Sequence, residues 1–196
     1  MSKKNKIVVI QGDKLKTINK DTDTSLLLAL EAQRRGYKIY YYETKNLNFT
    51  NGKVYAYIKE LKLFKKNKKF YKVINQKFFD LSKANYVLIR QNPPFNMDYI
   101  TATFFLEQLP KNVKVVNNPI SVRNVSEKFY SVNFLKYMPP TIFTKNIEQI
   151  KKFTKKYKKI VIKPIHGYGG KNILFINKII NQIKVLNYIK KFGHVM

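Results

Sequence analysis

The 196-residue sequence contains no cysteine, which excludes a disulfide scaffold, a thiolate metal site and a cysteine nucleophile. Its only two histidines, His166 and His194, are too few for a multi-histidine zinc site. No apolar run approaches the roughly 20 residues of a membrane-spanning helix. The apolar residues after the polar start are also too few for a signal peptide. We therefore expect a soluble, cytoplasmic protein with no membrane segment.

Carboxylates are scarce too, since 11 Asp and Glu face 39 Lys and Arg, which gives a net charge of +28. Only four of the cations are arginine, the side chain that grips phosphate and guanine with two donors at once. The lysines are spread along the whole chain, which favours a solvated lysine-rich surface over a nucleic-acid interface. Because 44% of the residues are hydrophobic, including 14 Tyr and 14 Phe, the chain can bury a globular core.

The first half of the sequence predicts a strand–helix–strand unit, which is typical of a parallel sheet. An apolar strand over residues 7–10 is followed by a polar loop, a helix capped by Asp23 that ends at Gly36, and a strand over 38–42. Asn51-Gly52 indicates a hairpin between strands over 47–50 and 53–58. A strand over 86–90 precedes two prolines, and a helix over 98–109 leads to a strand over 113–116.

The pattern changes near residues 118–126, where we place a domain boundary. Ser126 and Glu127 predict the start of a helix through Leu135, which Pro139 and Pro140 stop. The remainder predicts a strand at 141–143, a helix at 147–157, a strand at 160–163, a glycine loop, a strand at 172–176 and a helix at 179–191.

Neither common nucleotide-binding fingerprint occurs. Only Gly12 follows the first strand, so the dinucleotide pattern with three glycines is missing, and no P-loop sequence is present. The segment from Lys163 through Gly167, Gly169 and Gly170 is the remaining candidate. Glycine backbones can approach phosphate oxygens closely, and a strand-end lysine can contact phosphate. An ordinary hairpin loop with a surface lysine explains the same residues.

Single residues elsewhere carry weaker signals. His166 lies in the glycine loop. A solvent-exposed position without a catalytic role is favoured for it over a catalytic role. Arg90 ends a buried strand at the edge where parallel sheets bind ligands, and a structural ion pair is an equal alternative. Asp13 and Asp23 follow the first strand and are expected at the same edge.

Several segments, taken in order, closely resemble the bacterial glutathione synthetases. They span residues 18–25, 30–37, 90–95, 99–103, 116–119, 121–123, 127–128 and 163–170. The resemblance implies an α/β chain of two parts. A parallel-sheet pre-ATP-grasp substrate domain over residues 1–122 is followed by an incomplete ATP-grasp nucleotide-lid domain, of α+β type, over 123–196.

The resemblance also implies a function: ATP-dependent ligation of gamma-glutamylcysteine to glycine through an acyl phosphate, with Mg²⁺. Lys128, Lys163 and the three loop glycines would hold the ATP phosphates. Asp13, Asp23 and Arg90 would lie on the substrate side, without an assigned contact. No catalytic residue or metal ligand is identified.

The chain also departs from the family. His166, Tyr168, Asn92 and Asn96 stand where the family usually has Asp, Met, Asp and Asp, and Gln91 stands where it has Lys. Members run to a little over three hundred residues, and the last carboxylate here is Glu148.

We therefore expect a fragment or split gene product whose metal ligands lie in the missing C-terminal part. We expect it to be inactive alone, and the candidate partners are further copies of the chain in a homo-oligomer or a complementing C-terminal fragment. The alternatives are a non-catalytic remnant or subunit that acts as a binding module, and a basic nucleic-acid-binding protein.

Overall fold

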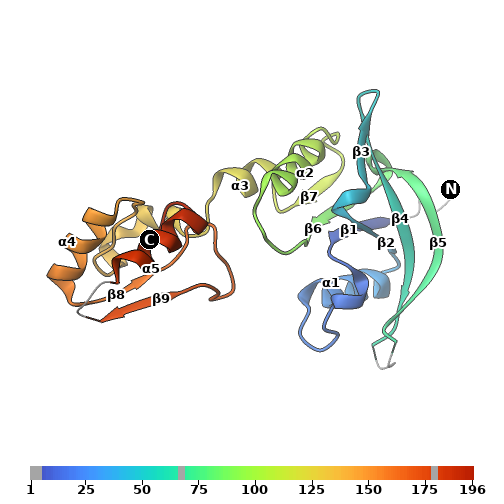
Figure 1. Ribbon diagram of the computed structural model, residues 1–196. Helices are drawn as coiled ribbons and strands as arrows, with labels where there is room; N and C mark the ends of the chain where they lie inside the picture. The colour runs from blue at the N-terminus through green and yellow to red at the C-terminus, as the bar shows by residue number, and fades with distance from the viewer. Residues whose placement is uncertain (1–5, 66–68, 178–180) are drawn as a thin grey trace. The chain divides into compact units, whose positions relative to one another are not determined.

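The computed structural model describes residues 6–65, 69–177 and 181–196 (Figure 1). The chain divides into two compact units, Met1–Arg123 and Asn124–Met196. In the described ranges, no helix is long and apolar enough to cross a membrane.

Unit 1 is built on a mixed sheet. Strands β1 (Ile7–Gly12), β2 (Lys38–Glu43), β6 (Tyr86–Ile89) and β7 (Lys114–Val116) pair in parallel in the order β2-β1-β6-β7. Strands β3 (Leu47–Thr50), β4 (Lys53–Leu63) and β5 (Tyr71–Asp80) are antiparallel, with β4 joining them to β2. The parallel part and the 47–58 hairpin confirm the prediction. The length of β4 and all of β5 were not predicted.

Alternate residues of the central strands fill two cores on opposite faces of the sheet. On one face, Val9 and Tyr40 pack with Ala102 and Leu106 of α2 (Met97–Glu107). On the other face, the apolar side chains of β1 and β2 pack with Leu26 of α1 (Thr24–Arg34). The two helices thus cover opposite faces and leave the carboxyl edge of the parallel strands accessible.

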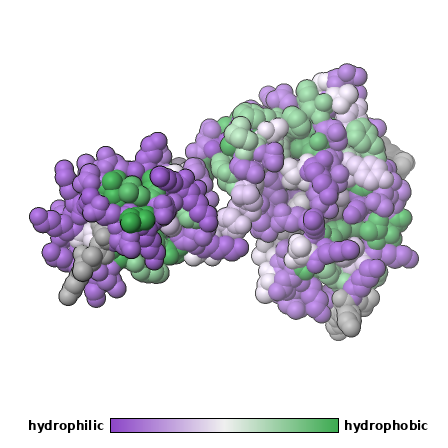
Figure 2. All heavy atoms as spheres, in the orientation of Figure 1, coloured by the Kyte–Doolittle hydropathy of each residue, from purple (hydrophilic) through white to green (hydrophobic). Residues whose placement is uncertain are grey.

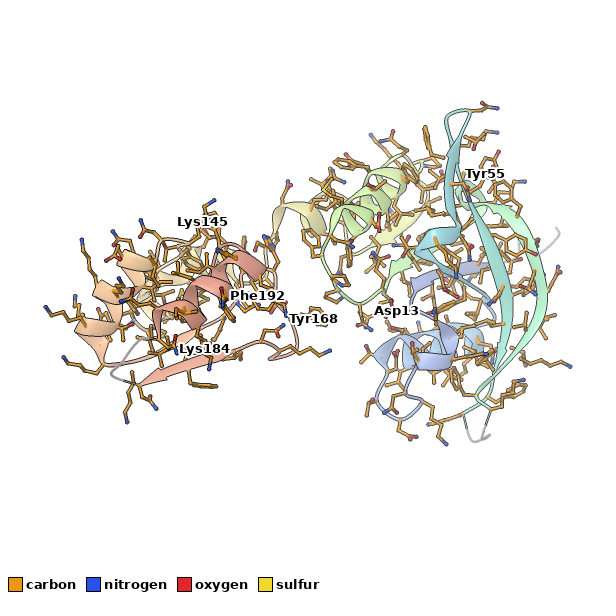
Figure 3. All side chains as sticks on the ribbon, in the orientation of Figure 1. Asp13, Tyr55, Lys145, Tyr168, Lys184 and Phe192 are labelled. Atoms are coloured by element: carbon orange, nitrogen blue, oxygen red, sulfur yellow. The ribbon has the colours of Figure 1, made fainter. Side chains whose placement is uncertain are left out.

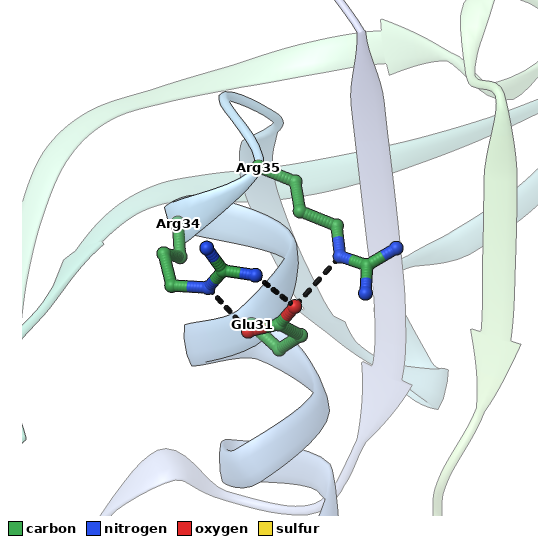
Figure 4. A network of polar contacts seen from close by, with 3 residues as sticks. All are labelled: Glu31, Arg34 and Arg35. Atoms are coloured by element: carbon green, nitrogen blue, oxygen red, sulfur yellow. Dashed lines mark hydrogen bonds and ion pairs between the residues drawn. The ribbon is translucent and has the colours of Figure 1, made fainter.

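Helix α1 ends in an ion-paired cluster (Figure 4). The Glu31 carboxylate accepts hydrogen bonds from the guanidinium groups of Arg34 and Arg35, each with a shortest distance of 2.7 Å. These bonds lower the pKa of Glu31 to about 2. Both arginines lie at the C-terminal end of α1, where positive charge complements the helix dipole, and their partner is an acid one turn earlier.

Short elements complete unit 1. Three 3₁₀ turns lie in its connections: Leu15–Thr17 between β1 and α1, Thr44–Asn46 between β2 and β3, and Leu81–Lys83 between β5 and β6. Helix α3 (Pro119–Asn124) follows β7. Helix α2 starts at Met97, one residue before the predicted start, because the Asn96 side chain accepts a hydrogen bond from the Tyr99 amide at 3.0 Å.

Unit 2 places two helices on a small antiparallel sheet. Strands β8 (Lys159–Ile162) and β9 (Leu174–Asn177) pair. Helices α4 (Ile147–Tyr157) and α5 (Gln182–Phe192) contribute Ile150 and Val185 to a core that also holds Ile162, Ile176 and Val195. Helix α4 has the predicted bounds. The predicted start of the last helix, at 179, lies outside the described residues.

Two predictions for unit 2 are wrong. The helix expected over 126–135 is a 3₁₀ helix, η4 (Phe129–Tyr137), with a break in helical geometry at Phe134. Ser131 Oγ and Asn133 Nδ2 donate to carbonyls three residues earlier, and η4 buries no residue, so neither backbone bonding nor packing favours a regular α-helix. The strand expected over 141–143 is replaced by an isolated bridge between Thr144 and Val195.

Most of the face in view is hydrophilic, with smaller apolar patches between the polar side chains (Figure 2).

Candidate functional site

Asp13, Asp23 and Arg90 line one small pocket in unit 1. The pocket has a volume of about 30 Å³ and is lined by Asp13, Thr17, Ile18, Asp23, Ser25, Tyr41, Arg90 and Asn92. Asp13 follows β1 and Arg90 follows β6, and these strands are parallel neighbours, so their carboxyl ends share one edge of the sheet. Figure 3 labels Asp13 at this position, directly after β1.

Arg90 is held by hydroxyl groups. Its Nε donates to Ser25 Oγ at 3.0 Å, and its terminal nitrogen donates to Thr24 Oγ1 at 2.6 Å. No ion pair involves Arg90 within the described ranges. The sequence left a structural ion pair of Arg90 as an alternative to ligand binding, and the described residues do not form one. Among the described residues no carboxylate is bonded to this guanidinium, and Asp13 and Asp23 line the same pocket.

Asp13 is fixed from two sides. Its carboxylate accepts from the backbone amide of Asn92 at 3.2 Å and from Asn92 Nδ2 at 2.6 Å. Its backbone carbonyl accepts from the Tyr41 hydroxyl at 2.7 Å. The asparagine at position 92, where the resembling family usually has Asp, supplies a side-chain donor that a second carboxylate would lack.

Tyr41 reaches Asp13 because Gly12 has no side chain. A Cβ atom at Gly12 would lie 2.1 Å from the Tyr41 hydroxyl oxygen, far inside contact distance. Burial, and secondarily the negative charges of Asp13 and Asp23, raise the pKa of Tyr41 well above its ordinary value. The phenol therefore stays protonated and keeps donating.

Asp23 has the predicted capping role. Its Oδ1 accepts from the amides of Ser25 at 2.7 Å and Leu26 at 3.1 Å at the start of α1. The second carboxylate oxygen of Asp23 has no hydrogen bond among the described residues. Structural and binding roles are therefore compatible in this one side chain.

The predicted nucleotide residues line a separate pocket inside unit 2. This pocket has a volume of about 190 Å³ and is lined by Glu127, Lys128, Lys163, Pro164, Gly167, Tyr168, Gly169, Gly170, Lys171 and Ile173. Three lysines face one glutamate in this set, so the pocket favours anions. Lys171 was not predicted for the site. Its position directly after the glycines could have indicated that it belongs to the same pocket.

The glycine loop has a backbone that few other residues could adopt. Gly169 and Gly170 have φ values of +60° and +69°, in the left-handed region. A Cβ atom at Gly167 would lie 2.6 Å from Pro164 Cγ. The ammonium group of Lys128 donates to the Gly167 carbonyl, which ties the residue before η4 to the loop. Tyr168 projects from the loop between β8 and β9 (Figure 3).

The described residues offer no cluster of three or more His, Asp or Glu that would hold a metal ion. His166 is exposed and does not line the pocket, as expected for a loop residue. His194 uses its backbone carbonyl to accept from the Ile165 amide at 3.2 Å.

The sequence matches the models of two protein-family domains. The N-terminal domain of prokaryotic glutathione synthetase matches residues 7–123. The chain belongs to the prokaryotic glutathione synthetase family. The ATP-grasp domain of the same family matches residues 127–193, the part that contains the lysine and glycine pocket.

Curated relatives agree with this assignment. The chain is 36% identical over 188 residues to a glutathione synthetase of Mesorhizobium japonicum, a match that covers 96% of this chain and 59% of the relative. It is 40% identical over 168 residues to that of Buchnera aphidicola subsp. Baizongia pistaciae, which covers 85% of this chain and 52% of the relative. The chain thus spans somewhat more than half the length of these relatives.

Solved structures share the fold at low sequence identity. D-cycloserine synthetase matches with a TM-score of 0.59 and 14% identity, over 96% of this chain and 57% of that one. The D-alanyl-alanine synthetase A of Vibrio cholerae matches with a TM-score of 0.58 and 12% identity, over 97% and 58%. The likeness supports a pre-ATP-grasp sheet domain followed by part of an ATP-grasp region.

Proposed function

We propose that this chain serves ATP-dependent glutathione synthesis, with the lysine and glycine pocket of unit 2 as its site for the ATP phosphates. The observation that carries the proposal is that Lys128, Lys163 and the three loop glycines line one cationic pocket, within the segment matched to the family's ATP-grasp domain. The two domains would be residues 1–122 for substrate and 123–196 for nucleotide. We place the protein in the cytoplasm, where the thiol substrate stays reduced.

In the proposed reaction, a carboxylate oxygen of gamma-glutamylcysteine attacks the terminal phosphorus of ATP, and ADP leaves. The amine of glycine then attacks the acyl carbon, and phosphate leaves as the amide bond forms. Neither step needs a covalently modified side chain. The contribution of the protein is positioning and charge neutralisation.

Lys128 and Lys163 are suited to phosphate oxygens as point charges. Their ammonium groups carry three donors each, and both lie at the pocket beside backbone amides of the glycine loop. The Lys128 bond to Gly167 holds that lysine at the loop before any phosphate arrives.

On the substrate side, Arg90 is suited to a substrate carboxylate, since only the hydroxyls of Thr24 and Ser25 hold its guanidinium. Asp13 and Asp23 are suited to an ammonium group, because both carry negative charge in the same pocket. At about 30 Å³ that pocket has room for the tip of a substrate group and not for a whole peptide.

Magnesium does not fit the residues of the nucleotide pocket. Mg²⁺ takes oxygen ligands, mainly carboxylates and phosphates, and Glu127 is the only carboxylate lining the pocket. Glu148 is the last acid in the sequence. We therefore derive no step through the metal, and we expect the chain alone, given ATP, Mg²⁺ and both substrates, to form no glutathione.

A pair of alanine variants of the whole chain tests the phosphate site. Lys163→Ala removes a pocket lysine, while Lys155→Ala removes an exposed lysine of α4 and serves as the charge-matched control. A charge-assisted bond contributes about 1.5–3 kcal/mol, so Lys163→Ala should weaken ATP binding at least about tenfold. Calorimetric titration with ATP measures both variants. Equal, small losses in the two would reject the site and assign any binding to overall charge.

A further inference from the structure

Four polar side chains of unit 1 are linked where its parallel strands end. Gln11 near the end of β1 is fully buried, and it lies between Tyr42 of β2 and Gln91, which follows β6. The Tyr42 hydroxyl donates to Gln11 Oε1 at 2.7 Å, and Gln11 Nε2 donates to Gln91 Oε1 at 2.5 Å. The Thr44 hydroxyl donates to the same Gln91 oxygen at 2.6 Å. We call these four residues the glutamine relay.

Burial fixes the direction of the bonds in the relay. Tyr42 is 1% exposed and lies in an apolar core. Burial raises the pKa of its phenol above the ordinary value, so the hydroxyl keeps its hydrogen. A buried hydroxyl hydrogen without an acceptor is costly, and Gln11 is its one acceptor in the described part of the chain. Gln11 therefore turns its oxygen toward Tyr42 and its amide nitrogen toward Gln91.

The orientation of the Gln91 amide follows from that of Gln11. If Gln91 were turned the other way, its amide nitrogen would face the Gln11 nitrogen, and two donors would oppose each other. Its oxygen instead accepts from Gln11 and from Thr44. Its Nε2 carries two hydrogens and donates to no residue within the described ranges. Because Gln91 is only partly buried, the relay presents a pair of neutral N–H donors to a ligand.

These donors lie at the same sheet edge as the charged pocket of unit 1. Arg90 and Asn92, the neighbours of Gln91 in sequence, both line that pocket. Arg90 bonds the hydroxyls at the start of α1, whereas Gln91 joins the relay, in which Tyr42 belongs to the core under α2. The edge therefore carries charged groups toward α1 and a neutral donor pair toward α2.

We propose that the Gln91 amide is a specificity-determining donor, which binds the peptide carbonyl oxygen of gamma-glutamylcysteine. The identity of this dipeptide rests on the proposed function. The charged pocket has room for the tip of a substrate group only, so the rest of a dipeptide must lie along the edge outside it, where Gln91 is the side chain next to Arg90 in sequence. A neutral amide pairs with a neutral carbonyl without leaving a charge uncompensated.

Hydrogen exchange of the side-chain amides tests the orientation in the unaltered whole chain without any ligand. The Gln11 amide hydrogens are buried and bonded to Gln91, so they should exchange at least about tenfold more slowly than the Gln91 amide hydrogens, which have no partner. Nuclear magnetic resonance with nitrogen labelling resolves the two side chains. Equal protection of the two amides would overturn the proposal, because the Gln91 donors would then be occupied within the fold.

The variant Gln91→Glu tests the ligand. Glutamate keeps an oxygen for Gln11 and Thr44 and replaces only the outward donors with an acceptor, so exchange of the β1 amides should be unchanged. Calorimetric affinity of the whole chain for gamma-glutamylcysteine should fall at least about tenfold. Gln76→Glu places the same charge at an exposed position of β5 and should leave the affinity unchanged. Equal losses in the two variants, or no loss in either, would overturn the proposal.

A capped probe identifies the acceptor oxygen. Gamma-glutamylcysteinamide carries an uncharged amide in place of the reacting carboxylate and keeps the peptide carbonyl, so Gln91→Glu should weaken its binding by the same factor. A loss confined to the uncapped dipeptide would assign the donor to the carboxylate and make the proposal wrong. In the unaltered chain both probes should shift the Gln91 side-chain amide resonances, and no shift would also make it wrong. These measurements use no ATP, so a failure of the ATP site in unit 2 appears separately, in the Lys163→Ala titration.

Discussion

Replacing Gly12 with alanine should separate the Tyr41 hydroxyl from Asp13 and loosen the substrate-side pocket. The new methyl group would lie 2.1 Å from the Tyr41 hydroxyl oxygen and 2.7 Å from Cζ. Tyr41 is only 5% exposed and packs in the core under α1, so its ring cannot move away without disturbing neighbours. The hydrogen bond from Tyr41 to the Asp13 carbonyl, 2.7 Å long, would be lost.

The magnitude follows from three contributions. Overpacking a core costs about 1–3 kcal/mol, and the lost hydrogen bond costs about 0.5–1.5 kcal/mol. Replacing glycine with alanine also lowers the conformational entropy of the unfolded chain, which stabilises the folded state by about 0.4–1 kcal/mol. We expect unit 1 of Gly12→Ala to lose about 2 kcal/mol of unfolding free energy, close to the middle of these ranges.

A double-mutant cycle with Tyr41→Phe tests the cause. Tyr41→Phe alone should cost about 1 kcal/mol, the price of one hydrogen bond. In the double variant the closest atom, the hydroxyl oxygen, is gone, so the combined loss should be smaller than the sum by about 1 kcal/mol. Hydrogen exchange of β1 and β2 amides measures unit 1, and unit 2 amides serve as the internal control. Additive losses would refute the contact as the cause.

Three further predictions concern stability. Glu31→Gln should lower the melting temperature at pH 7, where the carboxylate is charged. The difference should shrink as pH falls below the ordinary pKa of 4.5, and most of it should be gone at pH 2, where the native carboxylate is itself becoming protonated; a difference as large at pH 2 as at pH 7 would contradict this. Gly170→Ala, with φ at +69° and open space around it, should cost about 1–2 kcal/mol from backbone strain alone, whereas a neutral effect in urea unfolding would show that the loop relaxes. Asn146→Ala removes the side chain that accepts from the Glu148 amide at 2.8 Å and should lower the unfolding free energy of unit 2 by about 1 kcal/mol. Hydrogen exchange should become faster for unit 2 amides only, and Asn146→Asp should restore their protection.

Local signals in the sequence were enough for much of the fold. Asp23 before an apolar helix, and Asn51-Gly52 between two strands, each fix a backbone feature through nearby bonds, and both were predicted. Strand β5 was missed because only one of its ten residues is buried and because it pairs with the long β4 strand, a pairing with no short-range signature. The 3₁₀ geometry of η4 was missed because it depends on a lack of burial, which no local pattern records.

The candidate sites follow the same division. The glycines and Lys163 are adjacent in sequence, so their grouping was visible. Asp13 and Arg90 were expected at one edge because parallel strands end together. The links through Tyr41, Asn92 and Ser25 were not predicted, because each joins a site residue to a side chain on another element or to a helix start.

The bond from Lys128 to Gly167 makes the loop tolerant of change in its side chains. The acceptor is a backbone carbonyl, which every amino acid carries, so neither His166 nor Tyr168 takes part in it. Substitution at those two positions can alter the charge and shape of the loop while its tether to the residue before η4 stays intact. Position 167 itself has no such freedom, since Pro164 occupies the space of a side chain. Positions 166 and 168 can therefore change without loss of the hydrogen bond that holds the Lys128 ammonium group at the loop, whereas position 167 cannot.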